Sequence, residues 1–585
     1  MRLPIVADRL ALSADVSPGE LNVNCVSLSR GFTRTVVAAA SAIAILLSSA
    51  MAAVAADAKP IAVVSIAGVK KLQDDVKYLT AAAGVEEEGK SVVALLRLYT
   101  PGIDPNKPIG VVLLPHEGDI EELIFLPVTN LKAFLTVLEP QIGEPLSTEG
   151  GIMEFDDGQK LFVKEQAGWA FAARNKAMLA TVPQDPTPWL GDMPKTHTIA
   201  AKILVKNIPQ DVLAAGMDEI KYAFERSLDL LSDVGPDVNP DDAAKTGRGL
   251  VTALEKQVNE TDEMLFGLTI DPTTKKLTFE VKQLAIDGSD LAKQFALASD
   301  TKTNFAGFIM PGAAVHGNFS GKMSEDDVKQ FAATLTAARK DLLNRIENDP
   351  VLTPERREGS KKYATRLFDL LDEALKDGKI DGGFSVMLEP KSFTVVAGGH
   401  FAKAAEFEQI FKDLAVDAQG EPDLPELKAN VSSHGGVNFH TVSQAVPEDW
   451  SEARDVIGDK AIWTIGTSKT ALYVAFGRNG ESLLKQVIDN SATSADKTVP
   501  PSRVTVAMLP IFKFLASIDE RPLLPLVVKA VEDANAGDKI LFSQEPVERG
   551  ISAKMSIEEG VLRPIGVAVK EAIKTFFGNG DDSEL

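Results

Sequence analysis

Residues 63–83 read VVSIAGVKKLQDDVKYLTAAA, and residues 315–333 read VHGNFSGKMSEDDVKQFAA. Each stretch begins with alternating apolar residues, which predict a short strand, and continues with apolar residues at helical spacing. The tetrapeptide DDVK occurs in both stretches, at 74–77 and at 326–329. A strand followed by an amphipathic helix, present twice, indicates an internal duplication.

A second pair of segments follows the first in both places. Residues 109–126 contain two apolar runs separated by Pro115, and residues 384–396 contain two runs separated by Pro390. A helical pattern follows each pair of runs. Because proline fixes φ and cannot donate to a sheet ladder, it is expected at the turn between two strands. Both segments therefore predict strand, turn, strand and helix.

A third pair of segments has a tryptophan at a similar position in each. Residues 167–182 and 460–476 alternate apolar and polar positions around a basic, small-residue turn, which predicts a hairpin in each. Trp169 stands near the start of the first segment and Trp463 near the start of the second. The two side chains are expected to fill equivalent positions.

Two more pairs keep the same order along the chain. The segment TIAAKILVKNIPQDVLA, which begins at Thr198, matches SRVTVAMLPIFKFLA, which begins at Ser502. Pro272 and Pro546 form the last pair, and each stands between two short apolar runs. The preserved order of five pairs is the argument for a duplication, since single matches arise by chance.

The five pairs divide the chain into two homologous halves, at about residues 59–305 and 306–578, with a tail at 579–585. Short apolar runs that alternate with polar residues favour antiparallel strands with one buried face. No G-x-G-x-x-G turn follows a strand, so a doubly wound parallel sheet is not expected. The predicted fold is α+β: two homologous domains, each a mainly antiparallel sheet covered by helices. The expected helices lie at residues 76–83, 130–138, 211–231, 243–260, 328–343, 360–377 and 407–414.

An uncharged, alanine-rich run covers residues 35–56, after Arg30 and Arg34. Basic residues, a short apolar region and small residues, in that order, are typical of a secretory signal peptide. We place the signal peptide at residues 30–55, with cleavage after Ala53-Val-Ala55, and take residues 1–29 as a leader or an over-called start. The alternative is an uncleaved membrane anchor, because the uncharged run is long enough to span a bilayer.

Composition excludes several classes of function. The only cysteine is Cys25, in the leader, so the mature chain is expected to have no disulfide, thiol nucleophile, cysteine zinc site or iron–sulfur cluster. The net charge of −22 disfavours nucleic acid and anionic membranes as partners. We expect no cofactor, an unidentified protein or envelope partner, and no stable membrane insertion after cleavage; the oligomeric state stays open.

Residues 84–91 read GVEEEGKS and match the phosphate-loop pattern G-x-x-x-x-G-K-[ST]. That loop must follow a strand, whereas these residues follow the helix predicted at 76–83. Gly84 is better interpreted as a helix C-cap. Three consecutive glutamates would also repel a polyphosphate. We therefore predict no nucleotide site here.

Two weak metal candidates remain. His434 and His440 bracket the sequence HGGVNFH, although there is no H-x-x-x-H helical pair. Asp237 and Asp241 lie in an acidic, proline-rich stretch whose oxygens would suit calcium, but the spacing does not fit an EF-hand loop. No catalytic residue is predicted, because no nucleophile–base motif stands in a rigid setting.

The paired strand–turn–strand–helix segments resemble a loose class of large exported bacterial proteins of unknown function. The resemblance covers most of the mature chain, has no diagnostic motif and implies no catalytic residue. Three functions stay open. The first is a non-catalytic binding or scaffold protein of the bacterial periplasm or cell envelope, the second a carrier of an apolar ligand such as lipid, and the third a hydrolase whose active site is assembled from distant residues.

Overall fold

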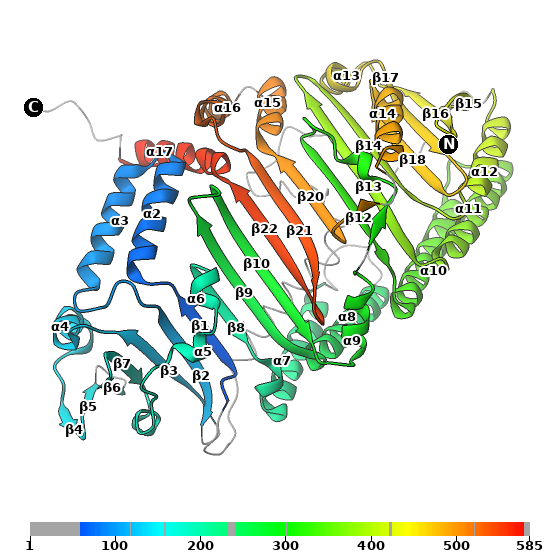
Figure 1. Ribbon diagram of the computed structural model, residues 1–585. Coiled ribbons are helices and arrows are strands. Elements are labelled where there is room, and N and C mark those ends of the chain that lie inside the picture. Colours follow the sequence, from blue (N-terminus) through cyan, green and yellow to red (C-terminus); the bar gives the residue numbers. More distant parts are fainter. Residues whose placement is uncertain are drawn as a thin grey trace, which may run out of the picture. The chain divides into compact units, whose positions relative to one another are not determined.

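The computed structural model describes residues 59–116, 119–156, 160–231, 240–299, 301–420, 424–494, 497–519 and 521–577 (Figure 1). The leader, the signal peptide with Ala53 and Ala55, Asp237 and the tail at 579–585 lie outside the described residues. The described part has the predicted α+β fold, with extended antiparallel sheet and many helices. None of its helices is long and apolar enough to cross a membrane.

The chain divides into two compact units. The described residues up to Lys293 and from Val547 onward form the N-terminal unit, and Gln294–Pro546 form the C-terminal unit. This division differs from the expected halves at its end, since residues 547–577 group with the N-terminal unit rather than with the second half.

In the N-terminal unit every strand pairs antiparallel with its neighbours. The strands are β1 (Ala62–Ile66), β2 (Ile109–His116), β3 (Asp119–Pro127), β4 (Ser147–Glu149), β5 (Ile152–Asp156), β6 (Lys160–Gln166), β7 (Trp169–Ala173), β8 (Ile199–Ile203), β9 (Thr261–Asp271), β10 (Lys276–Ala285) and β22 (Gly550–Glu558). Their spatial order is β4-β5-β6-β7-β3-β2-β1-β8-β9-β10-β22.

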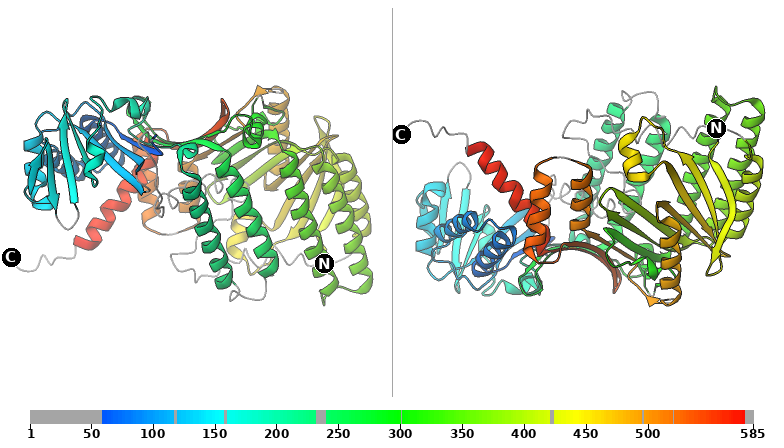
Figure 2. Two further views of the ribbon diagram at one scale, coloured as in Figure 1. Left: turned by 90° about the horizontal axis from the view of Figure 1, so that it is seen from below. Right: turned by 90° about the horizontal axis from the view of Figure 1, so that it is seen from above.

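Helices follow the strands of this unit in pairs or singly. They are α2 (Val69–Ala83), α3 (Glu86–Tyr99), α4 (Leu131–Ile142), α5 (Thr187–Leu190), α6 (Met193–Thr196), α7 (Gln210–Leu231), α8 (Pro240–Asn259) and α17 (Arg563–Phe577), with α9 (Asp290–Ala296) at the unit's boundary. Figure 2 shows α7 and α8 side by side on one face of the sheet. Ile203 and Met264 of the sheet are buried there against Val212 and Met217 of α7 and Val258 of α8.

The other large core of the N-terminal unit is aromatic. Phe125, Trp169 and Phe171 are buried together on β3 and β7. Trp169 meets Phe125 edge-on, with ring centroids 5.8 Å apart, and Trp189 lies 5.9 Å from Phe125. Such edge and tilted ring contacts stabilise beyond the apolar area that they bury.

The C-terminal unit has the same kind of sheet. Its strands are β12 (Val315–Lys322), β13 (Lys379–Glu389), β14 (Ser392–His400), β15 (Glu426–His434), β16 (Val437–Ala445), β17 (Lys460–Thr467), β18 (Ala471–Gly477), β20 (Ser502–Ala507) and β21 (Lys539–Val547). Their spatial order is β15-β16-β17-β18-β14-β13-β12-β20-β21, all antiparallel. Two short strands, β11 (Lys302–Thr303) and β19 (Lys497–Thr498), pair separately.

The helices of the C-terminal unit are α10 (Glu325–Asn348), α11 (Pro354–Leu375), α12 (Ala404–Asp417), α13 (Ser451–Ile457), α14 (Gly480–Ala492), α15 (Met508–Ile518) and α16 (Leu523–Ala534). The core lies between α14 and the sheet, where Leu484 and Val487 pack with Phe308, Val396 and Phe439. All seven helices expected from the sequence are present as part of a described helix. The other helices of the described residues were not predicted from the sequence, and these are α3, α5, α6, α9, α13, α14, α15, α16 and α17.

The predicted hairpin at residues 167–182 is wrong. Only β7 is a strand there, and it pairs with β6 before it and with β3. After β7, Asn175 caps a 3-10 helix, η1 (Lys176–Leu179), by accepting the N–H of Ala177. Leu179 is buried by this turn of helix, so the apolar alternation came from helical packing rather than from a strand.

Trp169 and Trp463 are consequently not at the same place. Trp169 begins β7, opposite Gln166 and Pro127, whereas Trp463 lies in β17, the first strand of the β17–β18 hairpin. The DDVK tetrapeptides also differ in position. Residues 74–75 are the sixth and seventh of α2, while residues 326–327 are the second and third of α10, where Asp327 forms a capping box with Ser324.

Candidate functional site

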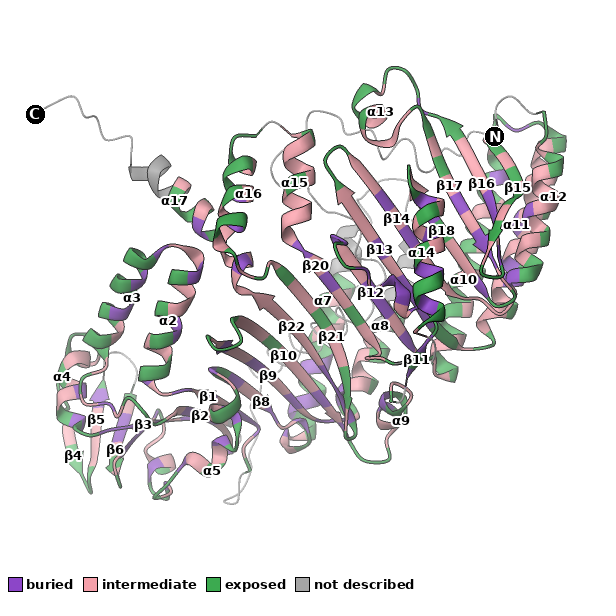
Figure 3. Cartoon of the chain, turned by 45° about the horizontal axis from the view of Figure 1, so that its top comes forward, coloured by how far each residue is buried: buried purple, intermediate pink, exposed green. Residues whose placement is uncertain are grey.

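Helix α3 presents a continuous apolar face that the rest of the described chain leaves uncovered. Val92, Leu95, Leu98 and Tyr99 are 46%, 55%, 60% and 41% exposed. Their spacing of three, three and one residues places them along one side of the helix. Figure 3 colours much of α3 as exposed, whereas β9, β10 and β22 of the same unit are mostly intermediate with some buried positions. Clustered exposed apolar side chains mark an interaction surface more often than scattered ones do.

The position of α3 is set by a tight connection to α2. Gly84 ends α2 with φ 77°, and its N–H bonds to the carbonyls of Ala81 and Thr80. This is the left-handed C-cap that the sequence predicts. Glu86, Glu87 and Glu88 then form the first turn of α3, where negative charge is favoured by the helix dipole.

The phosphate-loop pattern thus lies on a helical hairpin and follows a helix rather than a strand. Lys90 is exposed and binds Glu87 at 2.6 Å instead of pointing into a phosphate cradle. Gly89 is the point of closest approach between the helices, because a Cβ there would lie 2.1 Å from Thr80 Oγ1. The second glycine of the pattern therefore has a packing role.

We expect Gly89→Ala to lower the free energy of unfolding by about 1–3 kcal/mol, because the added methyl group forces α3 away from α2. This is opposite in sign to the gain that alanine gives over glycine in an exposed helix. Urea unfolding measures it. The neighbouring Lys90→Ala is the control, and it should change the free energy of unfolding little. We expect nucleotide to give no thermal shift with the wild type, and therefore none with Lys90→Ala. A stable Gly89→Ala protein would contradict the close packing.

The two histidines of HGGVNFH do not come together. They lie in β15 and β16, joined by a turn at Gly435 and Gly436 with φ of 58° and 78°. His434 faces α14, where its Nε2 lies 2.7 Å from Asp489 Oδ1. His440 points to the opposite face, since alternate residues of a strand face opposite ways, and its ring lies 5.1 Å from that of Phe411 in α12. One metal ion cannot bind both.

His440 is buried inside a chain of hydrogen bonds. Its Nδ1 accepts the backbone N–H of Asn430, so in the neutral ring the proton sits on Nε2 and is donated to Thr467 Oγ1 at 3.0 Å. Thr467 donates in turn to Glu408 at 2.8 Å. Because the imidazole donates to the hydroxyl, it cannot also remove the hydroxyl proton. Threonine, histidine and glutamate here form a structural chain rather than a nucleophile with its base.

Stability should fall as the solution becomes acidic, in part because burial lowers the pKa of His440. Below about pH 6.5 the imidazole of His440 is protonated in the unfolded chain but stays neutral in the folded chain. The free energy of unfolding therefore declines with falling pH until the lower pKa of the folded state is reached. Urea unfolding at about pH 7.5 and about pH 5.5 measures the decline. His440→Gln should show a smaller decline than wild type. A remaining decline is expected, since burial also lowers the pKa of His316; an unchanged decline would contradict the assignment.

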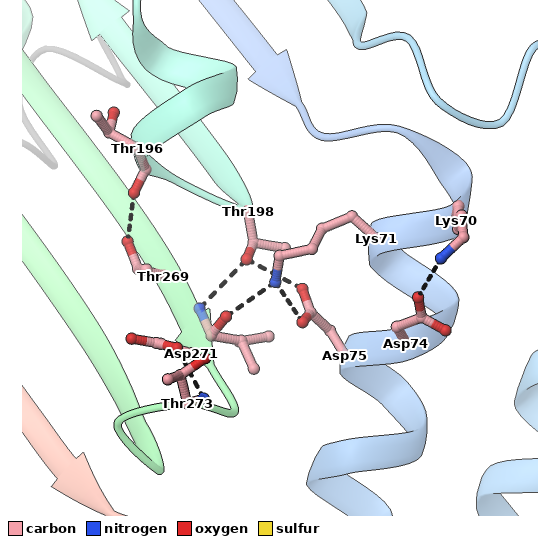
Figure 4. A network of polar contacts seen from close by, with 10 residues as sticks. Lys70, Lys71, Asp74, Asp75, Thr196, Thr198, Thr269, Asp271 and Thr273 are labelled. Carbon is pink, nitrogen blue, oxygen red and sulfur yellow. Dashed lines mark hydrogen bonds and ion pairs between the residues drawn. The ribbon is translucent and has the colours of Figure 1, made fainter.

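A second buried network ties α2 to the sheet of the N-terminal unit (Figure 4). Asp75 is 2% exposed, and Lys71 forms an ion pair with it. Lys71 Nζ also donates to the carbonyl of Ile270 at 2.8 Å, and Thr198 Oγ1 donates to Asp75 at 3.0 Å while accepting the N–H of Ile270. Both carboxylate oxygens are therefore occupied by donors of the chain itself.

A third cluster brings serine, histidine and glutamate together. Ser552 Oγ donates to Glu280 at 2.6 Å, and His197 Nε2 lies 3.1 Å from the other oxygen of Glu280. Burial acts to raise the pKa of Glu280, but the bonds from Ser552 and His197 outweigh it and lower the pKa. In a catalytic triad the histidine lies between serine and acid, whereas here the glutamate is in the middle. This order does not activate the serine.

The acidic stretch gives no metal site within the described residues. Asp241 belongs to the first turn of α8, while Asp237 is outside the described part. Within that part, no three histidine or carboxylate side chains gather in a way that would hold a metal ion.

Helix α3 and its apolar face are not predicted from the sequence, because residues 84–91 are tested only as a phosphate-binding loop. The signal was present in EEEGKSVVALLRLY, where acidic residues precede apolar residues at helical spacing. Comparisons with protein-family models, with curated proteins and with solved structures gave no match.

Proposed function

We propose that this chain is an exported, non-catalytic binding or scaffold protein of the bacterial periplasm or cell envelope, and that it binds a protein partner through α3. The observation that carries the proposal is the uncovered apolar face formed by Val92, Leu95, Leu98 and Tyr99. The hydrogen-bonding order of the His440 and Glu280 networks supports the non-catalytic part, since neither activates a hydroxyl.

The partner site is tested by comparing complexes purified from the host. We expect native mass spectrometry of the wild type to show a bound protein that is lost in Leu95→Ser/Leu98→Ser. Leu146→Ser is the matched control, because Leu146 is exposed but stands outside helix α3. Loss of the partner in the control as well, or its retention in the double variant, would exclude α3 as the binding face.

Export is tested by N-terminal sequencing of the protein from its host. Cleavage after Ala55 gives a chain that begins at Ala56. An intact Met1 in the membrane fraction would instead support the uncleaved anchor.

The duplication is also proposed, and the order of elements supports it. Read from one edge, β4-β5-β6-β7-β3-β2-β1-β8-β9 has the same chain-order pattern as β15-β16-β17-β18-β14-β13-β12-β20-β21. In each half a pair of helices follows the strand that comes first in the chain: α2 and α3 follow β1, and α10 and α11 follow β12. A second pair follows the strand beside it: α7 and α8 come after β8, and α15 and α16 after β20. The same order of nine strands in both halves supports descent from one duplicated domain, because so long an order would rarely arise twice by chance.

A second candidate function, the binding of an apolar ligand, is favoured by one face of the N-terminal sheet. Ile199, Leu268, Phe279 and Met555 lie directly opposite one another on β8, β9, β10 and β22. Ile199 and Phe279 are each 39% exposed, although they share a face with the core that α7 and α8 bury. A half-covered apolar row of this kind suits an acyl chain.

A fluorescent fatty acid tests this second candidate. We expect Phe279→Ser to weaken binding, and Phe331→Ser, which changes an exposed phenylalanine on α10, to leave it unchanged. Absence of saturable binding to the wild type would remove the carrier function.

A further inference from the structure

The strand–turn–strand segments β9–β10 and β21–β22 share details that fix how their residues correspond. Pro272 directly follows β9, and Pro546 is the penultimate residue of β21. Lys275 follows Pro272 at the same interval as Arg549 follows Pro546, and both basic residues have φ of 56°. A basic residue in the left-handed conformation is uncommon, so its recurrence at one interval after proline aligns the two segments residue by residue.

In this alignment β10 and β22 pair with each other symmetrically. Residues 276–284 correspond to residues 550–558. In the antiparallel ladder Lys276 lies opposite Glu558, Leu284 opposite Gly550, and Glu280 opposite Lys554. Glu280 and Lys554 also correspond to each other in the alignment, so the ladder is centred on a corresponding pair. Two equivalent strands that meet around a centre of this kind make the contact of a two-fold symmetric dimer.

The side chains at the centre are complementary. On a true two-fold axis the central residue would meet its own copy, and like charges directly opposite in a ladder repel. Here Glu280 meets Lys554, with 4.0 Å between Oε1 and Nζ. Beside them Thr278 and Ser556 are hydrogen-bonded at 3.1 Å. The difference between glutamate and lysine favours β10 with β22 over β10 with a second β10.

The segment that carries β22 is suited to exchange between two copies of the chain. Residues 547–577 contain β22 and α17, follow the C-terminal unit in the chain and complete the N-terminal unit. An element that completes a unit formed by residues distant in the chain is the kind that is swapped between copies in domain-swapped dimers.

We propose that the β10–β22 ladder is a dimer interface that this chain has internalised, and that two copies can share it reciprocally, with Glu280 and Lys554 determining which strands pair. This inference rests on the proposed duplication and is independent of the partner site on α3. Its partner is a second copy of this chain.

Two full-length mature variants test it. Lys554→Glu places two glutamates at the centre of the ladder, and Glu280→Lys places two lysines there. Within each variant the pairing is repulsive, but β10 of either variant is complementary to β22 of the other. When the two are unfolded together and refolded, we expect a heterodimer, seen by native mass spectrometry with one chain isotopically labelled. We expect about tenfold more heterodimer than homodimer of either variant, since two repulsive pairs become attractive.

Three controls separate the charge effect from other effects. The exchanged variant Glu280→Lys/Lys554→Glu should be a monomer and more stable than Lys554→Glu. Glu280→Gln measures the loss of the charge and of one of the two acceptor oxygens that contact Ser552 and His197, without a repulsion. Lys282→Glu changes the same strand away from the centre and should give no heterodimer with Lys554→Glu. Only monomers in the refolded mixture, or a Lys554→Glu protein as stable as wild type, would overturn the proposal. Partner binding through α3 would be unaffected by that outcome.

Discussion

Trp169→Ala is expected to lower the free energy of unfolding by about 3–5 kcal/mol. Trp169 is 4% exposed and contacts Phe125 edge-on at 5.8 Å, and Lys107 Nζ lies 5.6 Å from the ring centroid. Removing the indole leaves a large cavity in the aromatic core on one face of β3 and β7, and both of these strands are paired on both sides, which limits their collapse into the space. Urea unfolding followed by circular dichroism measures the loss.

Trp463→Ala serves as the comparison and should cost less, about 1–2 kcal/mol, because its indole is only partly buried. Its main contact is stacking on Phe476 of the neighbouring strand, with centroids 4.9 Å apart. Equal losses from the two substitutions would show that the tryptophans have equivalent surroundings after all.

Asp75→Ala should cost about 3 kcal/mol, because it removes one partner of a buried ion pair and leaves Thr198 without its acceptor. The cost stays at the low end for buried pairs because the Lys71 side chain is 44% exposed and can turn to water. Urea unfolding measures it. The effect should also appear as faster hydrogen exchange at Ile270, whose N–H donates to Thr198.

The adjacent Asp74→Ala provides the control within the same tetrapeptide. Asp74 is half exposed and pairs with Lys70 and Lys77 on the surface of α2. Exposed pairs on helices contribute little, so we expect a change within about 0.5 kcal/mol. If both aspartates had the same effect, the network of Figure 4 would not be stabilising α2 against the sheet.

The long amphipathic helices were predictable because their pattern extends over several turns. The helix predicted at 328–343 lies within α10, which begins with a capping box formed by Ser324 and Asp327. Strand hairpins around Pro390 and Pro272 were predictable for a similar reason, since a proline stands between two alternating runs.

Short segments were harder because a few residues fit more than one period. Residues 176–182 alternate like a strand, yet they form one turn of 3-10 helix and a loop that bury Leu179 and Val182. The repeated DDVK shows the same problem at the level of motifs. Asp75 is a buried anchor of α2, whereas Asp327, at the same place in the second tetrapeptide, forms the capping box at the start of α10.

The candidate sites depended on contacts that sequence spacing does not encode. Asp75 meets Thr198 across 123 residues, and Ser552 meets Glu280 across 272 residues. His434 and His440 are close in sequence and therefore suggested a pair. The register of the β15–β16 hairpin places them on opposite faces of the sheet. Which of these polar side chains come into contact is determined by the three-dimensional fold.

Strand β15 has a consequence for aggregation. Within the described residues it pairs only with β16, so its outer edge offers backbone groups to any other extended chain. The pairing breaks between Lys428 and Ser432, and Asn430 in that gap has φ of 53°. A bulge of this kind twists the edge away from the flat geometry that a fibril would template. The C-terminal unit therefore carries, in the irregularity of this edge strand, its own protection against filament growth.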